Sequence, residues 1–128
     1  MKALLIADDS HEKIKMIRHF LALMKWNGDV HVAHTTEEAF RFIDSSDDVS
    51  YACVDYYIPS QNGPAIIRRL KGKFPAYAIA LVSSADNERN AKEAKEAGAE
   101  AVICTTHRSD EVERAFKDLV TDWMNREA

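Results

Sequence analysis

Short apolar segments alternate with longer amphipathic segments along the chain. The apolar segments are rich in valine, isoleucine, leucine and alanine, a composition typical of strands buried in a sheet. They are Ala3 to Ala7, Val30 to Ala33, Tyr51 to Val54, Ile79 to Val82 and Ala101 to Cys104. The pattern predicts five strands, each followed by a segment long enough for a helix.

The amphipathic segments carry apolar residues three or four positions apart, the spacing of a helix packed on a sheet. They are His11 to Trp26, Thr35 to Ile43, Pro64 to Leu70, about Glu88 to Ala97, and Ser109 to Trp123. Thr35 and Glu38 fit a capping box, and Pro64 stands near a first helical position. Pro75 ends the third helix, and Gly98 follows the fourth as a natural C-cap residue. The sequence therefore predicts five helices.

Strand-helix alternation of this kind predicts a doubly wound α/β domain. Near-continuous apolar strands are typical of a parallel sheet with both faces covered, and right-handed crossovers place helices on the two sides. In such sheets, ligands bind at the carboxyl ends of the strands near the point where strand order reverses. The residues that follow each apolar segment are therefore the candidates for function.

Polar side chains follow four of the predicted strands. They are Asp8-Asp9-Ser10, Asp55-Tyr56-Tyr57, Ser83-Ser84 and Thr105-Thr106-His107. We expect the carboxylates of Asp8, Asp9 and Asp55 to converge at one edge of the sheet. Like charges held this close repel one another unless a cation neutralises them. Mg²⁺ is the natural cation, because it prefers carboxylate, carbonyl, water and phosphate oxygens.

Composition limits the class of protein. The 128 residues suit one domain, residues 1–128, and the balance of 46% hydrophobic with 30% charged residues is that of a soluble globular protein. No run approaches the roughly 18 apolar residues of a membrane span, and the opening MKALLIADDS lacks the pattern of a secretory signal. With a net charge of −4 and no basic stripe, nucleic acid is not an expected partner. We expect a cytoplasmic protein without a membrane partner.

The cysteines are expected in the core and the histidines at the surface. Cys53 and Cys104 both lie in apolar runs, so we expect reduced core residues, with a disulfide as the less favoured alternative. The five histidines lack the spacing of a metal motif and are expected at the surface. No cofactor box is implied.

Three motifs carry a resemblance to a known family. Asp8-Asp9 resembles an acidic pair at the end of the first strand, and the segment from Asp55 to Gly63 resembles a phosphoacceptor loop, with Asp, an aliphatic residue, Pro and Gly at matching offsets. Ala97-Gly98-Ala99 also fits. The chain thus resembles the receiver domains of two-component response regulators over nearly its whole length. The resemblance implies a flavodoxin-like sheet with strand order 2-1-3-4-5.

The resemblance also implies roles for the acidic residues. Asp55 would be the nucleophile that accepts a phosphoryl group from a phosphohistidine or a small phosphodonor. Asp9 and Asp55 would contact Mg²⁺ directly, the backbone carbonyl of Tyr57 would supply a further oxygen, and Asp8 would act partly through water. Tyr57 also occupies a position that controls the approach of water in the family, so we expect slow autodephosphorylation.

The carboxyl ends of the fourth and fifth strands fit the family less well. In the family, a switch hydroxyl in this segment moves to meet the phosphoryl oxygen. The number of residues between this position and Gly98 favours Ser83, whereas Ala85 directly after Ser84 favours Ser84. We prefer Ser83. Thr105 occupies the position of a lysine that the family uses to bind phosphoryl oxygens. A hydroxyl there supplies a hydrogen bond but no charge.

The missing lysine leaves two functional alternatives. In the preferred one, Asp55 is still phosphorylated, and either His107 or Arg108 is a candidate to replace the lost charge. In the other, the domain is a pseudo-receiver that binds proteins without phosphorylation. Val102 stands where the family carries an aromatic residue that rotates on phosphorylation. In both alternatives, the surface formed by the fourth and fifth helices must therefore signal in a different way.

The resemblance implies partners and excludes other classes. A sensor histidine kinase or histidine phosphotransfer protein would donate the phosphoryl group, and a downstream protein or output domain would respond to it. The domain would be a signalling phosphoacceptor rather than an enzyme, catalysing at most its own phosphorylation and dephosphorylation, as a monomer or weak homodimer. An aspartyl phosphatase would need a second acid two residues after Asp55, where Tyr57 stands, and a flavodoxin-like cofactor binder would need a phosphate loop in place of Asp8 and Asp9.

Overall fold

The computed structural model describes residues 2–47, 49–75 and 77–127. Its strands are β1 (Ala3–Ala7), β2 (Val30–Ala33), β3 (Val49–Val54), β4 (Ala78–Ser83) and β5 (Ala101–Cys104). Its helices are α1 (His11–Leu23), α2 (Thr36–Ser45), α3 (Gly63–Lys73), α4 (Glu88–Ala97) and α5 (Ser109–Arg126). Every predicted strand and helix is present, in the predicted order.

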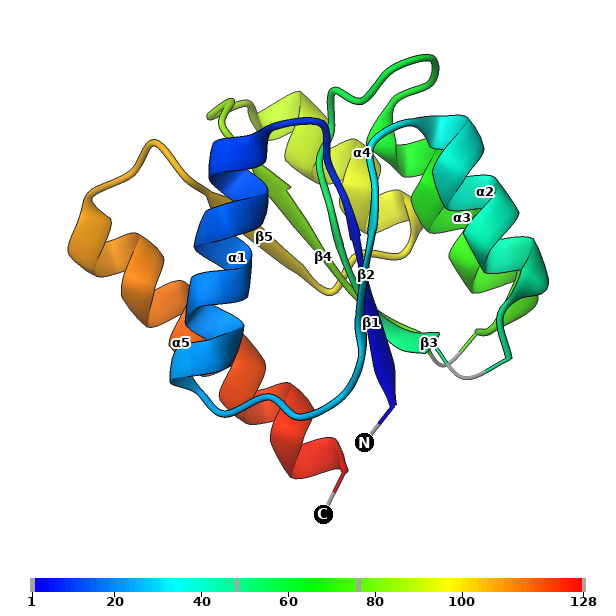
Figure 1. The fold of residues 1–128 in the computed structure, drawn as a ribbon. Coiled ribbons are helices and arrows are strands. Elements are labelled where there is room, and N and C mark those ends of the chain that lie inside the picture. The colour runs from blue at the N-terminus through cyan, green and yellow to red at the C-terminus, as the bar shows by residue number, and fades with distance from the viewer. Residues whose placement is uncertain (1, 48, 76, 128) are drawn as a thin grey trace.

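The strands form a single parallel sheet in the order β2-β1-β3-β4-β5, which confirms the predicted doubly wound, flavodoxin-like topology. Helices α1 and α5 cover one face of the sheet, and α2, α3 and α4 cover the other (Figure 1). The strand order reverses between β1 and β3, so the carboxyl ends of these neighbouring strands form the crevice in which such folds bind ligands.

The two sheet faces are packed by separate hydrophobic clusters. Alternate residues of a strand point to opposite faces: Leu4 and Ile6 of β1 pack with α1 and α5, whereas Leu5 packs with α2, α3 and α4. Phe20 of α1 stacks on Phe116 of α5 with ring centroids 5.0 Å apart. Each fully buried aliphatic side chain contributes about 1.5–3 kcal/mol. This core fixes the strand ends that carry the polar residues.

The ends of α1 and α5 differ from the prediction by three residues each. Helix α1 ends at Leu23, three residues before the predicted Trp26, because Lys25 adopts a left-handed conformation with φ 61°. The N–H of Trp26 then donates to the Leu21 carbonyl at 2.9 Å, which closes the helix. Helix α5 continues past Trp123 to Arg126, whose guanidinium pairs with Glu100.

The predicted caps of α2 and α4 are confirmed. Thr35 Oγ1 accepts a hydrogen bond from the N–H of Glu38 at 3.1 Å, and the Glu38 carboxylate accepts one from the N–H of His34 at 2.5 Å. Gly98 follows α4 with φ 130°, a conformation that L side chains rarely adopt. These local signals are sufficient to set both helix boundaries.

The cysteines are free, and β4 lies between the strands that carry them. Cys53 is buried as predicted, but Cys104 is half-buried, which corrects the prediction that both are core residues. All five histidines are exposed, as predicted. In the described part of the chain, no helix has the length and apolar character that crossing a membrane requires.

Candidate functional site

The predicted acidic site forms at the carboxyl ends of β1 and β3. The N–H of Asp8 donates to the Ala33 carbonyl, and that of Asp55 donates to the Ala7 carbonyl, both at 2.9 Å. These bonds extend the sheet by one residue and bring the two carboxylates together. Ligand oxygens of Asp8, Asp9 and Asp55 all lie within 4.8 Å of one another. Asp8 and Asp55 are buried, whereas Asp9 is exposed to solvent.

Lys13 supplies a positive charge to this site from α1. Its Nζ atom lies 2.9 Å from Oδ2 of Asp8 and 2.8 Å from Oδ1 of Asp55. The same ammonium group donates to the carbonyl of Val82, at the end of β4, at 3.1 Å. Ser10 caps α1 by accepting the N–H of Lys13 at 3.3 Å, so Lys13 lies in the first turn, beside the sheet edge. The residue is only 8% exposed.

The sequence reasoning missed Lys13, although a signal was available. A lysine in the first turn of a helix is unfavourable with respect to the helix dipole, so it indicates that some other partner compensates. Lys13 also precedes Ile14 and lies four residues before Ile17, on the edge of the buried stripe of α1. Two aspartates upstream were the obvious partners.

The two residues proposed from sequence to replace the missing charge are paired elsewhere. His107 Nε2 lies 3.3 Å from Oδ2 of Asp86, and the Arg108 guanidinium lies 3.3 Å from the carboxylate of Asp110. Both side chains are exposed. The structure therefore places the ammonium group of Lys13 against Asp55, while His107 and Arg108 pair with other carboxylates.

Burial and charge act in opposite directions on Asp55. Burial raises the pKa of Asp55 above its usual range, and the Asp8 carboxylate adds to that increase. The hydrogen bond and charge of Lys13 lower the pKa, as does the N–H of Tyr56, which donates to Oδ1 at 2.8 Å. The positive charge of Lys13 thus offsets part of the cost of burying the Asp55 carboxylate.

The carboxylates retain oxygens that suit a hard cation. Oδ1 of Asp8 accepts the N–H of Ser10 at 2.9 Å, whereas the buried Oδ2 contacts the Lys13 ammonium group at 2.9 Å as an ion pair without hydrogen-bond geometry. Asp55 uses Oδ1 for both Tyr56 and Lys13, and Asp9 is exposed beside it. An oxygen-only donor set with an incompletely bonded buried oxygen fits Mg²⁺.

The loop after β3 is held close to Asp55 by a glycine. The N–H of Gly63 donates to the carbonyl of Tyr56 at 2.7 Å. A Cβ atom at Gly63 would lie 2.1 Å from the carbonyl oxygen of Asp55, so a larger residue would displace this backbone. Glycine is therefore required by close approach, which explains its place at the end of the motif.

The two tyrosines after Asp55 have different surroundings. Tyr56 is buried, and its hydroxyl donates to Oε2 of Glu93 at 2.6 Å. Tyr57 is 55% exposed, and its hydroxyl accepts a hydrogen bond from the Asn90 side chain at 3.2 Å. The exposed Tyr57 side chain is therefore tied to the first turn of α4.

An open hollow of about 550 Å³ gives access to Asp55. It is lined by Asp9, Ser10, Glu12, Lys13, Met16, Asp55, Tyr57, Ser84 and Thr105. Ser84 is exposed there, whereas Ser83 is buried and its Oγ accepts the N–H of Ala85 at 3.2 Å. Ser84 therefore faces the hollow, whereas the hydroxyl of Ser83, the residue preferred from sequence, is hydrogen-bonded within the loop after β4. Thr105 borders the hollow, as its predicted position requires.

The doubly wound sheet and the acidic site at its switch point together define a receiver-type α/β domain. A family model of the response regulator receiver domain matches residues 4–117. The chain therefore belongs to the response regulator receiver family, the signalling phosphoacceptors of two-component systems, as its motifs predicted. No curated protein matches the sequence closely.

Solved structures with the same fold are distant in sequence. The Mn²⁺-bound response regulator Rcp1 aligns with a TM-score of 0.82 at 12% identity, covering 96% of this chain and 94% of that one. The phosphorylated cyanobacterial phytochrome response regulator RcpA gives 0.82 at 14% identity, with the same coverage. A CheY-like receiver domain protein from Methanospirillum hungatei JF-1 gives 0.76 at 22% identity, covering 100% and 99%. At these identities, the comparison establishes the fold.

Proposed function

We propose that Asp55 accepts a phosphoryl group in the presence of Mg²⁺. The observation that carries this proposal is the convergence of Asp8, Asp9 and Asp55 within 4.8 Å, with the Lys13 ammonium 2.8 Å from Asp55. Phosphorylated RcpA and Mn²⁺-bound Rcp1 share the fold and support the same chemistry here.

In this proposal, Asp9 and Asp55 hold the cation directly, the Tyr57 carbonyl supplies another oxygen, and Asp8 acts partly through water. A bound divalent cation supplies charge that offsets repulsion between two anions brought together. One Asp55 oxygen attacks phosphorus as the P–N bond of a donor phosphohistidine breaks. The imidazole keeps the electron pair of that bond and takes a proton from solvent.

We assign to Lys13 the charge that the family places at the end of β5. Its ammonium group donates to Asp55 before the transfer and is placed to donate to a phosphoryl oxygen afterwards. Thr105 borders the same hollow and offers a neutral hydrogen bond. Ser84 is our choice for the switch hydroxyl, since its side chain is exposed in that hollow. The slow loss of phosphate expected from Tyr57 remains a prediction.

The test is a mass measurement on the intact protein. Incubation with Mg²⁺ and acetyl phosphate or phosphoramidate is expected to add one phosphoryl group, and Asp55→Asn is expected to abolish the gain. Omitting Mg²⁺ is the matched control, and it should also abolish the gain. If the wild-type protein gains no mass with either phosphodonor in the presence of Mg²⁺, the proposal is contradicted.

A pseudo-receiver that binds proteins without phosphorylation is the second candidate, and one observation favours it. Lys13 Nζ bridges Asp8 and Asp55, so the site is partly neutralised without a metal ion. Calorimetric titration with Mg²⁺ separates the two candidates. Heat of binding that disappears in Asp9→Asn supports the phosphoacceptor, and the absence of binding supports the pseudo-receiver.

We also propose a histidine kinase or a histidine phosphotransfer protein as the donor of the phosphoryl group. The phosphorylated domain would act on a downstream protein or an output domain, as a monomer or weak homodimer in the cytoplasm. Phosphotransfer from a labelled histidine phosphotransfer protein to the wild type, but not to Asp55→Asn, is the expected result.

A further inference from the structure

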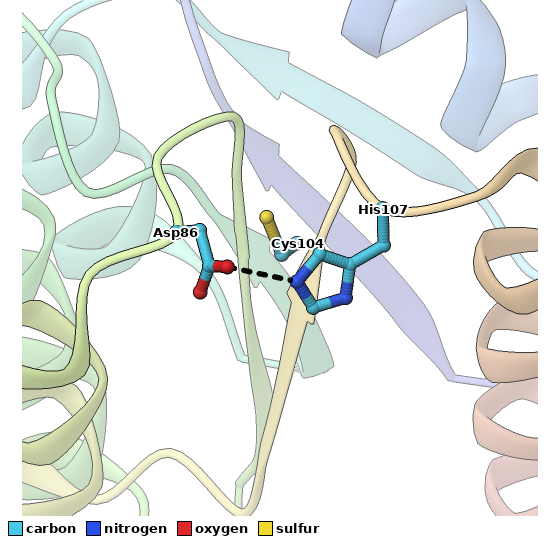
Figure 2. A group of neighbouring side chains, drawn as sticks. All are labelled: Asp86, Cys104 and His107. Carbon is cyan, nitrogen blue, oxygen red and sulfur yellow. Dashed lines mark hydrogen bonds and ion pairs between the residues drawn. The ribbon is translucent and has the colours of Figure 1, made fainter.

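A second group of ligating side chains lies outside the acidic site. Asp86 follows β4, Cys104 ends β5, and His107 precedes α5, and the three side chains gather at one place (Figure 2). Their ligand atoms all lie within 4.8 Å of one another. Among the described residues, this trio and the aspartate trio are the two groups that bring three such side chains together.

The trio borders a hollow of about 200 Å³ between α4, β5 and α5. Leu81, Val102 and Val112 contribute apolar lining, and the residues that line this hollow are all different from those that line the hollow at Asp55. The two sites are therefore separate, although the ends of β4 and β5 contribute to both.

We propose that Asp86, Cys104 and His107 bind Zn²⁺ or a chemically similar transition-metal cation. The donor set is one sulfur, one nitrogen and one oxygen, which suits a borderline-soft ion and not Mg²⁺. With the thiol deprotonated and the imidazole neutral, the two negative charges balance a divalent cation. Three protein ligands leave one position open for water or a ligand from a partner.

The distance between the nitrogen and oxygen ligands suits a tetrahedral ion. Nitrogen and oxygen ligands bound at about 2.0–2.1 Å lie roughly 3.3 Å apart around a tetrahedral centre. Nε2 of His107 and Oδ2 of Asp86 are 3.3 Å apart. A hydrogen bond gives a similar distance, so the half-buried thiol of Cys104 beside the pair is the distinguishing feature.

A hydroxyl stands next to the sulfur. Oγ1 of Thr106 lies 3.1 Å from Sγ of Cys104, where it is placed to donate a hydrogen bond to a thiolate. Outer hydrogen bonds of this kind orient metal ligands and tune their basicity. Thr106 thus supports the sulfur ligand from the turn that follows β5.

Metal binding here would act on the face formed by α4 and α5. The cation would tie the loop before α4 to the loop before α5, with Val102 lining the hollow behind it. Val102 stands where the family carries its aromatic switch residue. The site would therefore give this face a metal-dependent restraint in place of an aromatic rotation.

Cobalt substitution tests the proposal directly. The full chain is reduced, kept in excess Mg²⁺ to occupy the acidic site, and titrated with Co²⁺. The expected result is one equivalent bound, with a thiolate-to-metal charge-transfer band that Zn²⁺ removes by displacing Co²⁺. Cys104→Ser is expected to lose the band, while Cys53→Ala keeps it. No band in the wild type, or an unchanged band in Cys104→Ser, would overturn the site.

A second measurement tests the other two ligands. Competition with a chromophoric zinc chelator should show at least about tenfold weaker Zn²⁺ binding in His107→Ala and Asp86→Asn, but not in His19→Ala. Equal affinities in all these variants would overturn the assignment. Because the two sites are separate, acetyl phosphate is expected to phosphorylate Cys104→Ser to the wild-type level. Failure of the proposed metal site can therefore be distinguished from failure of the proposed phosphoacceptor site.

Discussion

The Nζ atom of Lys13 lies 2.8 Å from Oδ1 of Asp55, so the positive charge at the phosphoacceptor candidate comes from α1. The end of β5, where the family carries a lysine, has Thr105 instead. The charge is thus carried by α1, which packs beside α5 on one face of the sheet, whereas α4 lies on the opposite face (Figure 1). Any response to phosphorylation that passes through this ammonium group would begin in α1.

Removing the Lys13 charge should impair both folding and phosphorylation. Lys13→Met leaves two buried carboxylates without their partner, and breaking a buried ion pair costs about 3–5 kcal/mol. We expect a lower free energy of unfolding, partly restored by Mg²⁺, and a phosphorylation rate reduced by about 100-fold, by analogy with loss of one oxyanion-binding donor. Urea unfolding and mass-monitored phosphorylation measure the two effects.

The control is Lys15→Met, which removes an exposed lysine from the same helix. A Lys13→Met protein that is phosphorylated as fast as Lys15→Met would show that Lys13 has no part in the chemistry.

Moving the charge to its usual place in the family should rescue activity. In Lys13→Met/Thr105→Lys, the new ammonium group starts from the rim of the same hollow, since Thr105 lines it. We expect at least about a tenfold faster phosphorylation than in Lys13→Met, because a charged hydrogen bond is restored. Thr106→Lys in the same background is the matched control, and equal rates in the two double variants would refute the idea.

The adjacent serines should separate function from stability. Ser84→Ala removes an exposed hydroxyl in the hollow, so we expect a several-fold slower phosphorylation with little change in stability. Ser83→Ala leaves the N–H of Ala85 without its acceptor and should lower the free energy of unfolding by about 1 kcal/mol. Rates from intact mass and denaturation midpoints check both expectations; the reverse pattern would restore Ser83 as the switch residue.

Two glycines offer opposite outcomes for the same substitution. Gly63→Ala places a Cβ 2.1 Å from the Asp55 carbonyl, so it should destabilise the domain and slow phosphorylation by displacing Asp55. Gly72 lies in the last turn of α3, and an added Cβ there would meet no atom within 4 Å apart from its chain neighbours and the backbone of its own helix. Gly72→Ala should therefore raise the free energy of unfolding by about 0.5–1 kcal/mol. Thermal melts that rank the two variants the other way would contradict this reading of the loop.

The two thiols should differ in reactivity. Burial raises the pKa of Cys53 to about 12, and the charge of Asp8 adds to the shift. At pH 8 this thiol is almost wholly protonated, and the thiolate is the reactive form. Iodoacetamide should add once, at the half-buried Cys104, and a second time only after unfolding. Rapid double labelling of the native protein at pH 8 would contradict the burial of Cys53.

Local pattern was sufficient for the architecture of this protein. The apolar runs set the strands, caps such as Thr35 and Gly98 set helix ends, and a parallel sheet brings Asp8 and Asp55 together because their strands are neighbours. The position of these carboxylates follows from the strand order, which the resemblance to the receiver family predicted, whereas the periodicity of the sequence predicted the strands themselves.

The missed features depend on where individual side chains reach. Lys13 meets the Val82 carbonyl across 69 residues of sequence, and its long, flexible side chain could equally have extended into solvent. The different burial of Ser83 and Ser84, and the partial exposure of Cys104, follow from where β4 and β5 end against their neighbours. The sequence by itself determined the sheet and the acids at its edge. Only the tertiary structure decided which positively charged side chain pairs with them, because that choice depends on packing between elements far apart in the chain.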